Sequence, residues 1–262
     1  MMSSPKIERL DFAVQVPGVL AFSTLRGEVV AADAYSEVNL CDYTGDDSLH
    51  VTRNRRALCE HLHILPDRLV MPRQSHTTRV LHVDTKLMSL PQAQRARCLQ
   101  DVDALVTTLH GVCIGVNTAD CVPLALVDPT AGVTAVAHAG WRGTVGRIAA
   151  ETIAAMCQLG ADPKRIQVSM GPSICPRCFE VGDEVVDQFA QAGFPMSDIV
   201  TRPGKAHIDL QRANRFVLEE AGVQPDRITW SGHCSHCAPQ RYFSARAAGI
   251  HSGRTFTAIF RQ

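Results

Sequence analysis

The chain has no excess of charge and no long apolar run, and these two absences exclude several kinds of partner. Its 262 residues include 26 lysines and arginines against 26 aspartates and glutamates, so the formal net charge is zero. A broad electrostatic surface for nucleic acid or an anionic membrane is therefore not expected. The beginning of the chain lacks the apolar core of a signal peptide, and no run approaches bilayer-spanning length. We expect a cytoplasmic protein without nucleic-acid or membrane partners.

Nucleotide-binding signatures and a disulfide framework are also missing. Neither GxGxxG nor GxxxxGK[S/T] occurs, so a dinucleotide or P-loop site is not supported. The ten cysteines are scattered along a chain much longer than small secreted disulfide domains, which favours reduced thiols that are mostly buried. No internal repeat, low-complexity tract or linker divides the sequence. We therefore interpret residues 1–262 as a single domain.

Strand patterns outnumber helix patterns along the chain. Short apolar runs predict strands at residues 19–24, 69–71, 79–83, 103–108, 112–116, 166–170, 228–230, 242–244 and 255–260. Helical spacing and end signals predict helices near residues 48–63, 144–159, 180–192 and 209–221, whereas residues 86–100 are ambiguous. Because many neighbouring strands are joined by short turns, we predict an α/β (α+β) domain with mixed β-sheets flanked by helices.

The central stretch of the sequence predicts a strand pair with reactive side chains at its ends. Two valine-rich runs, residues 122–127 and 133–137, are separated by DPTAG, which is turn chemistry. Cys121 precedes the first run and His138 follows the second. Because a turn brings the outer ends of its two strands together, we expect the thiol and the imidazole to lie close to each other.

Two further chemical groups flank this pair. Asp120 precedes Cys121, and Arg142 lies in the AGWRG segment that follows His138. A thiol, an imidazole, a carboxylate and a guanidinium group at one end of a sheet are costly in a core and typical of a functional site. Cys121 as nucleophile and His138 as base would make a thiol hydrolase or amidase. Asp120 would then orient the imidazole or fix the loop backbone.

A third ligand would make Cys121 and His138 a catalytic metal site. His76, in the segment RQSHTT, is the candidate because it lies at another strand-to-loop junction. Catalytic zinc takes three protein ligands and keeps one position open, and thiolate and imidazole also suit copper. The alternative is that His76 is a surface loop residue and Cys121 a small core hydrophobe.

Several motifs support a family resemblance over nearly the whole chain. The segments NTADCVPLALVDP, AVAHAGWRG, QSH, GPSICPRCFEVG and HCSHC…YFSAR…SGR occur between residues 39 and 254. Together they resemble the YfiH-like family, whose members are also called laccase-domain proteins, polyphenol oxidases or peptidoglycan editing factors. Three departures stand out: Ser75 replaces a usual valine, Cys175 a common glycine, and Ala245 a usual tyrosine or histidine.

The resemblance implies a site, a fold and an activity. It implies a zinc site made of His76, Cys121 and His138, and an α/β fold related to bacterial cysteine-dependent toxin deamidases. The implied activity is phosphorolysis of the purine nucleosides adenosine, inosine and S-methyl-5′-thioadenosine, with accompanying adenosine deamination. Two alternatives stay open, a hydrolase that edits peptidoglycan precursors and a copper-dependent polyphenol oxidase. We rank the oxidase last because multicopper chemistry needs several coppers and many histidines. The oligomeric state is left open.

The implied reactions suggest roles for individual residues. In deamination, a metal ion lowers the pKa of bound water, and Asp120 is the first candidate to shuttle the proton. In phosphorolysis, Arg142 and then Arg73 are candidates to bind phosphate, because a guanidinium group binds oxyanions bidentately. Arg142 could instead form a structural salt bridge or clamp a carbonyl group. Asn39, in a polar loop, is a further candidate for contact with the substrate.

Two CxxC pairs lie outside this set, Cys175 with Cys178 and Cys234 with Cys237. Such pairs usually suggest structural zinc, but these two are much further apart than the pairs of a zinc ribbon. The family resemblance implies no second zinc. We expect reduced thiols near the rim of the pocket and keep a second metal site as the less favoured alternative.

Overall fold

Two β-sheets carry most of the fold, and each collects strands from distant parts of the sequence. The computed structural model describes residues 5–28 and 33–262. One sheet has six strands in the order β13-β9-β7-β8-β5-β4, and the other has five in the order β1-β2-β14-β6-β3. The strands are β1 Ile7–Arg9, β2 Val19–Thr24, β3 Leu69–Val70, β4 Val80–His82, β5 Ala104–Thr107, β6 Cys113–Thr118, β7 Val122–Asp128, β8 Val133–Ala139, β9 Gln167–Met170, β13 Ile228–Trp230 and β14 Thr255–Arg261.

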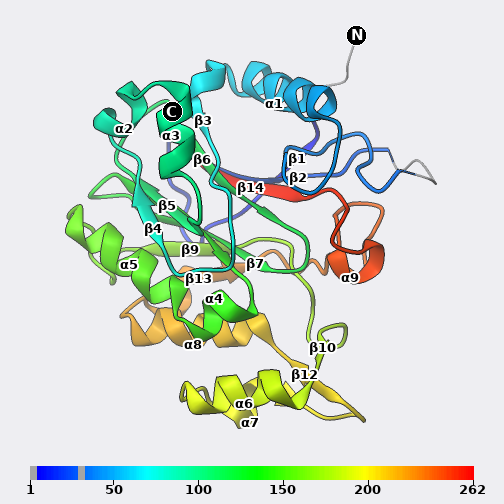
Figure 1. The fold of residues 1–262 in the computed structure, drawn as a ribbon. Helices are drawn as coiled ribbons and strands as arrows, with labels where there is room; N and C mark the ends of the chain where they lie inside the picture. Colours follow the sequence, from blue (N-terminus) through cyan, green and yellow to red (C-terminus); the bar gives the residue numbers. More distant parts are fainter. Residues whose placement is uncertain (1–4, 29–32) are drawn as a thin grey trace.

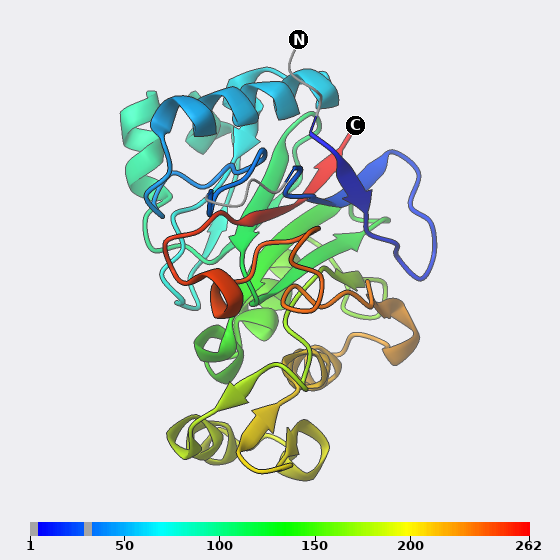
Figure 2. The same cartoon turned by 90° about the vertical axis from the view of Figure 1, so that its right-hand side faces the viewer.

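Helices cover the outer faces of these sheets, and a small third sheet extends from them. The third sheet has the order β10-β12-β11 and lies with α6 and α7 in a lobe at the bottom of Figures 1 and 2. These elements are β10 Glu180–Val181, β11 Val200–Thr201, β12 Ala206–Ile208, α1 Ser48–Leu62, α2 Thr85–Ser89, α3 Gln92–Cys98, α4 Trp141–Val145, α5 Ile148–Gln158, α6 Asp183–Gln191, α7 Met196–Ile199, α8 Leu210–Glu220 and α9 Ala245–Ala248. Within the described ranges, no helix combines the length and the apolar character needed to cross a membrane.

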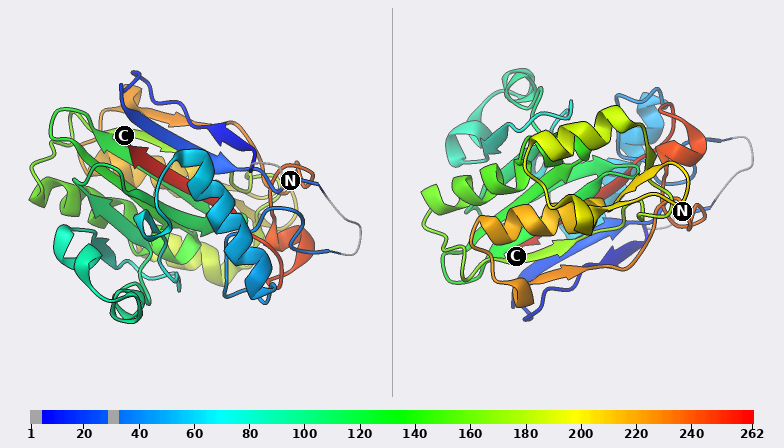
Figure 3. Two further views of the ribbon diagram at one scale, coloured as in Figure 1. Left: turned by 90° about the horizontal axis from the view of Figure 1, so that it is seen from above. Right: turned by 90° about the horizontal axis from the view of Figure 1, so that it is seen from below.

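Buried side chains form three core layers, because residues alternate between the two faces along each strand. On β14, Phe256 packs against α1, whereas Ile259 points to the six-stranded sheet. On β7, Ala125 joins the layer between the two sheets, and Leu124 packs on the opposite side with α5 and α8. Figure 3 shows α1 across one outer face and α5 and α8 across the other. The predicted mixed α/β domain with helices outside its sheets is confirmed.

The central strand pair forms as predicted. Strands β7 and β8 pair antiparallel from Val122 with Ala139 to Asp128 with Val133, and every residue of both strands is buried. The Asp128 carboxylate accepts hydrogen bonds from the backbone N–H groups of Thr130 and Ala131, which fixes the turn. The predicted first helix is confirmed as α1, with the Asp47 side chain accepting a hydrogen bond from Leu49 N.

Three predicted elements differ from the structure. The helix expected over residues 144–159 is two helices, because α4 ends at Val145 and Arg147 takes a left-handed conformation with φ of 65°. The helix expected from residue 180 begins only at Asp183, since residues 180–181 pair with β12 as a strand. The strand expected at residues 242–244 is wrong: Ser244 instead caps α9 by accepting a hydrogen bond from Ala247 N.

Candidate metal centre

One loop and two strand ends bring His76, Cys121 and His138 together. His76 lies in the loop between β3 and β4, Cys121 immediately precedes β7, and His138 is the penultimate residue of β8. The β7–β8 register pairs Val122 with Ala139, so Cys121 lies at the same end of the ladder as His138. One ligand atom from each of the three residues lies within 4.8 Å of the other two. The Cys121 Sγ atom is 4.0 Å from His76 Nε2, and the two imidazole rings pack edge to face.

The three side chains differ in exposure, which gives the cluster an inner and an outer side. His138 is buried, Cys121 is partly buried and His76 is exposed. A metal ion held by them would therefore face solvent on the His76 side. Three protein ligands with one open side is the arrangement of a catalytic zinc site rather than a structural one.

A buried carboxylate, Asp103, orders both histidines. Its Oδ1 atom lies 2.7 Å from His138 Nδ1, which leaves Nε2 of that ring for a ligand. The same carboxylate accepts hydrogen bonds from the backbone N–H groups of Ser75, His76 and Thr77. Burial alone would raise the pKa of Asp103, but its bonds to His138 and Thr77 prevail and lower the pKa to about 2. A carboxylate that orients a ligating imidazole is the usual outer partner of a metal-binding histidine.

The thiol and the inner imidazole stabilise each other's charged forms. Burial would raise the pKa of Cys121, but the neighbouring His138 and then His76 lower it below its usual value. Burial would lower the pKa of His138, but Cys121 and Asp103 raise it. The thiolate is the form that acts as a nucleophile and as a metal ligand, so the protein alone prepares Cys121 for either role.

Backbone geometry around the cluster is unusual and specific. His76 and Asp120 both have positive φ, 63° and 90°, a region that residues other than glycine seldom occupy. Gly140 has no room for a side chain: an added Cβ would lie 2.8 Å from Cys121 Sγ and 3.0 Å from His76 Cδ2. Such features persist where the surrounding structure determines them, and they gather at functional sites.

Asp120 does not orient the imidazole. Its carboxylate accepts hydrogen bonds from the Ser235 hydroxyl at 2.7 Å and from Arg246 N at 2.7 Å. Its carbonyl oxygen accepts a hydrogen bond from Ile174 N at 2.9 Å. Of the two roles that the sequence left open, fixing the loop therefore belongs to Asp120, and orienting His138 belongs to Asp103.

Asp103 was missed in the sequence because nothing local marks it. It lies 35 positions before His138 and enters the site only through the pairing of β5 with β8. The one available signal was a carboxylate directly before the apolar run of residues 104–106, where a charge needs a partner.

The two predicted phosphate-binding arginines are exposed and close to the ligands in sequence. Arg142, in α4, places its guanidinium group 4.2 Å from the centre of the Trp141 ring. Arg73 lies over the Tyr43 ring at 5.5 Å. Among the residues that the structure describes, no ion pair involves either arginine. Neither guanidinium group is therefore held in a structural salt bridge.

Asn39, the further candidate for contact with the substrate, lies in the interior of the protein. The side chain is fully buried, and its amide donates to Cys41 O at 3.0 Å and to Asp46 Oδ2 at 2.7 Å. Its oxygen accepts hydrogen bonds from the backbone N–H groups of Cys41 and Arg254. All four bonding positions of the amide are used within the protein, so Asn39 joins neighbouring loops in this structure.

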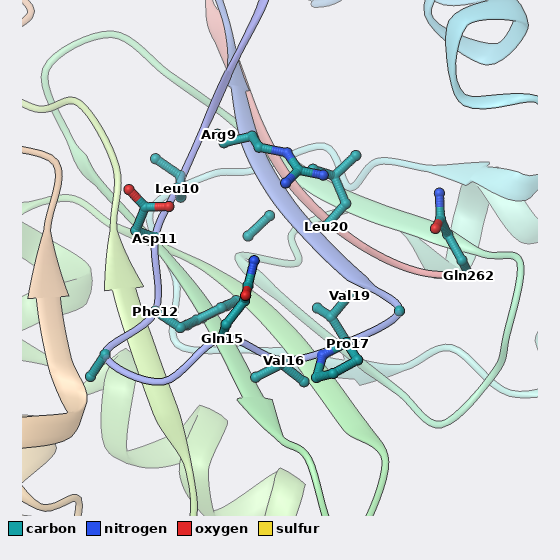
Figure 4. A pocket seen from close by; sticks show the side chains of 13 residues that line it. Arg9, Leu10, Asp11, Phe12, Gln15, Val16, Pro17, Val19, Leu20 and Gln262 are labelled. Carbon is teal, nitrogen blue, oxygen red and sulfur yellow. The ribbon is translucent and has the colours of Figure 1, made fainter.

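One surface cavity is separate from the cluster. It measures about 590 Å³ and is lined by residues 9–13, residues 15–21 and Gln262 (Figure 4). None of the predicted site residues lines it. A second cavity, of about 430 Å³, is lined partly by Cys175, Cys234 and Cys237.

The stacked mixed sheets and the open cluster of two imidazoles and one thiol define an α/β protein with a candidate catalytic metal centre. A family model described as "Multi-copper polyphenol oxidoreductase laccase" matches residues 20–262, and the chain belongs to this family. Two crystal structures have the same fold. YlmD from Geobacillus stearothermophilus is 32% identical with a TM-score of 0.86, and covers 94% of this chain and 93% of its own. YfiH from Bacillus licheniformis is 27% identical with a TM-score of 0.85, and covers 93% of each chain.

Curated relatives of this chain carry two enzyme names. "Adenosine deaminase RL5", from an unknown prokaryotic organism, is 56% identical over 98% of this chain and 99% of its own length. A "Purine nucleoside phosphorylase" from Bacteroides thetaiotaomicron is 38% identical over 91% and 90%. Another of that name, from Deinococcus radiodurans, is 40% identical over 91% and 87%. The resemblance to the YfiH-like family is thereby confirmed.

Proposed function

We propose that this chain is a zinc-dependent purine nucleoside phosphorylase that also deaminates adenosine. Its proposed nucleoside substrates are adenosine, inosine and S-methyl-5′-thioadenosine. The names of the curated relatives support both reactions. The observation that carries the proposal is the cluster of His76, Cys121 and His138, with its outer side exposed and its inner histidine held by Asp103.

The three side chains fit a metal ion by their chemistry and spacing. Two imidazole nitrogens and one thiolate are a known donor set for catalytic zinc, with bonds of about 2.0 to 2.3 Å. Ligand atoms within 4.8 Å of one another can reach a common ion with small shifts of the side chains. When bound, zinc supplies a Lewis acid that activates water or polarises an atom of the substrate.

The protein's own groups then have separable tasks. Asp103 holds the His138 ring and the loop that carries His76, so that both imidazoles keep their orientation. Arg142 and Arg73 are the proposed phosphate-binding groups, since their guanidinium groups are exposed and free of carboxylate partners among the described ion pairs. Asp120 remains the candidate proton carrier by its position next to Cys121, although its two oxygens already accept hydrogen bonds.

The test compares the purified protein with Cys121→Ala and with Cys157→Ala. Cys157 is a matched control because it belongs neither to the His76–Cys121–His138 cluster nor to the two CxxC pairs. Zinc content is measured alongside the release of base and of ammonia from adenosine and inosine. We expect base release to require phosphate in the wild type. Cys121→Ala should lose one zinc ion per chain and both activities, whereas the control keeps them. Zinc-replete wild-type protein that releases neither base nor ammonia would contradict the proposal.

A second candidate function rests on the same residues without a metal ion. Cys121 and His138 have ligand atoms within 4.8 Å of each other, and His138 is hydrogen-bonded to Asp103. A nucleophile, a base and an orienting carboxylate in this order follow the logic of a cysteine hydrolase. A hydrolase of peptidoglycan precursors would use this triad. Hydrolysis of a muramyl-amino-acid substrate that survives complete removal of metal would favour it over the phosphorylase. The copper oxidase stays last, because the described residues offer one cluster with imidazoles and one with thiols alone.

A further inference from the structure

The two CxxC pairs, far apart in sequence, meet at one edge of the six-stranded sheet. Cys175 and Cys178 follow β9, and Cys234 and Cys237 follow β13. Strands β9 and β13 are parallel neighbours, so their following loops leave the same edge of the sheet side by side. Backbone hydrogen bonds join the two loops. Ser173 N donates to His233 O, and Ser173 O accepts a hydrogen bond from Ser235 N.

The four sulfur atoms are arranged as ligands of one ion. All four lie within 4.8 Å of one another, and the Sγ atoms of Cys178 and Cys237 are 3.4 Å apart. Four thiolates bound to zinc at about 2.3 Å in a tetrahedron have sulfurs about 3.8 Å apart. The 3.4 Å distance lies just below that value and the 4.8 Å limit lies above it, so the four sulfurs are already close to the spacing of a tetrahedral site.

Backbone amides support the same arrangement. Cys234 Sγ accepts hydrogen bonds from Cys175 N at 3.2 Å and from Cys237 N at 3.4 Å. Cys178 N donates to Cys175 O at 3.0 Å, which closes the first CxxC turn. Hydrogen bonds to sulfur favour the thiolate, the form that binds metal. The cavity lined by Cys175, Cys234 and Cys237 gives an ion or a chelator a way in from solvent.

We propose that Cys175, Cys178, Cys234 and Cys237 bind a second, structural zinc ion. Four protein ligands fill a tetrahedral site and leave no position for water or substrate, so this ion is not catalytic. Sulfur donors alone select zinc or an iron–sulfur centre over magnesium and calcium. This favours the second metal site that the sequence had ranked below free thiols.

The proposed ion would also fix the backbone beside the candidate catalytic site. Ile174, next to Cys175, donates its N–H to Asp120 O, and Ser235, next to Cys234, donates its hydroxyl to Asp120 Oδ1. Asp120 has positive φ and precedes Cys121. A zinc ion that joins the two loops through four sulfurs would thus hold the turn that places Cys121 in the cluster with His76 and His138.

The experiment counts metal ions in wild type, Cys237→Ser, Cys121→Ala and Cys157→Ser, the last a matched control outside both clusters. Cys237 is the exposed member of the four, so its substitution disturbs packing least. We expect about two zinc ions per chain in wild type and in the control, and about one in each of the other two variants. In cobalt-substituted protein, Cys237→Ser should lose most of the sulfur-to-cobalt absorption, whereas Cys121→Ala should keep it.

A second measurement needs no variant. In native wild-type protein, alkylation should spare the four thiols until a strong chelator is added, and intact mass should show all of them reduced. Several results would overturn the proposal: a Cys237→Ser protein with the zinc content of wild type, iron in place of zinc, or a wild-type mass lower by two hydrogens per disulfide. Because these readouts do not use nucleoside turnover, their failure is distinct from failure of the proposed catalysis.

Discussion

Replacing Asp103 by asparagine should weaken metal binding at the His76–Cys121–His138 cluster without changing any ligand. The carboxylate receives only donors: His138 Nδ1 and His76 N on one oxygen, and three donors from Ser75 and Thr77 on the other. An amide of the same shape keeps one oxygen and presents an NH₂ group where the other stood. Whichever way the amide turns, at least two donors lose their acceptor.

The size of the effect follows from these contacts. A buried donor without an acceptor costs about 1 to 3 kcal/mol, so Asp103→Asn should lower the free energy of unfolding by about 3 kcal/mol. Loss of a carboxylate that orients a ligating histidine costs about 10- to 100-fold in metal affinity. That corresponds to about 1.4 to 2.7 kcal/mol of binding free energy at the first cluster.

The assay is competition for zinc with a chromogenic chelator, with thermal unfolding measured in parallel. Asp128→Asn is the matched control: Asp128 is also fully buried and also accepts several hydrogen bonds, but lies at the opposite end of β7 from Cys121. It should lower the melting temperature and leave zinc affinity at the first cluster unchanged. Equal affinities in Asp103→Asn and wild type, or equal losses in both variants, would refute the reasoning.

Three further changes probe the site and the core. Gly140→Ala should lower zinc affinity, because its Cβ would press on Cys121 Sγ and on the His76 ring. Competition with a chelator measures this affinity. An unchanged affinity would contradict the prediction and show that the two side chains can move aside. The pKa of Asp128 lies below its usual range, because hydrogen bonds from Arg165 and backbone groups outweigh burial, so its contribution to stability is full above about pH 4 and is lost as the pH falls through the lower folded-state pKa. Urea unfolding across this range should therefore show a shallower acid limb in Asp128→Asn than in wild type. Phe256→Ala should cost about 3 to 5 kcal/mol of unfolding free energy in urea titrations, because this fully buried ring packs on α1; a cost below 1 kcal/mol would contradict the described layers.

Local signals predicted most of the elements, and contacts between distant residues explain the errors. The β7–β8 pair and the cap of α1 are encoded within a few residues, so the sequence shows them directly. The break between α4 and α5 is not encoded in this way. Arg147 turns there to reach Glu220 and the carbonyl oxygen of Ala192, both from later parts of the chain. Helix propensity alone cannot anticipate such partners.

The site residues, like the secondary-structure elements, were predicted where local sequence signals place them and missed where contacts between distant residues do. Cys121 and His138 were predicted to meet because a short turn joins their strands, and the structure places them together with His76. Asp103 was missed because only the pairing of β5 with β8 brings it to His138. Both CxxC pairs were recognised, but a shared metal site was ranked below free thiols because the pairing of β9 with β13, which joins their loops, cannot be read from their spacing in the sequence.

The place of β14 in its sheet has a consequence for synthesis of the chain. The strand lies between β2 and β6, and the Ser23 and Thr257 side chains that join it to β2 are 234 positions apart. Because a ribosome makes the chain in sequence order, β2 emerges long before β14, and the edge of β2 that pairs with β14 stays uncovered until residues 255–261 have been made. An uncovered strand edge invites pairing with other chains. In a cell, the yield of this protein should therefore depend on how well chaperones shield nascent chains.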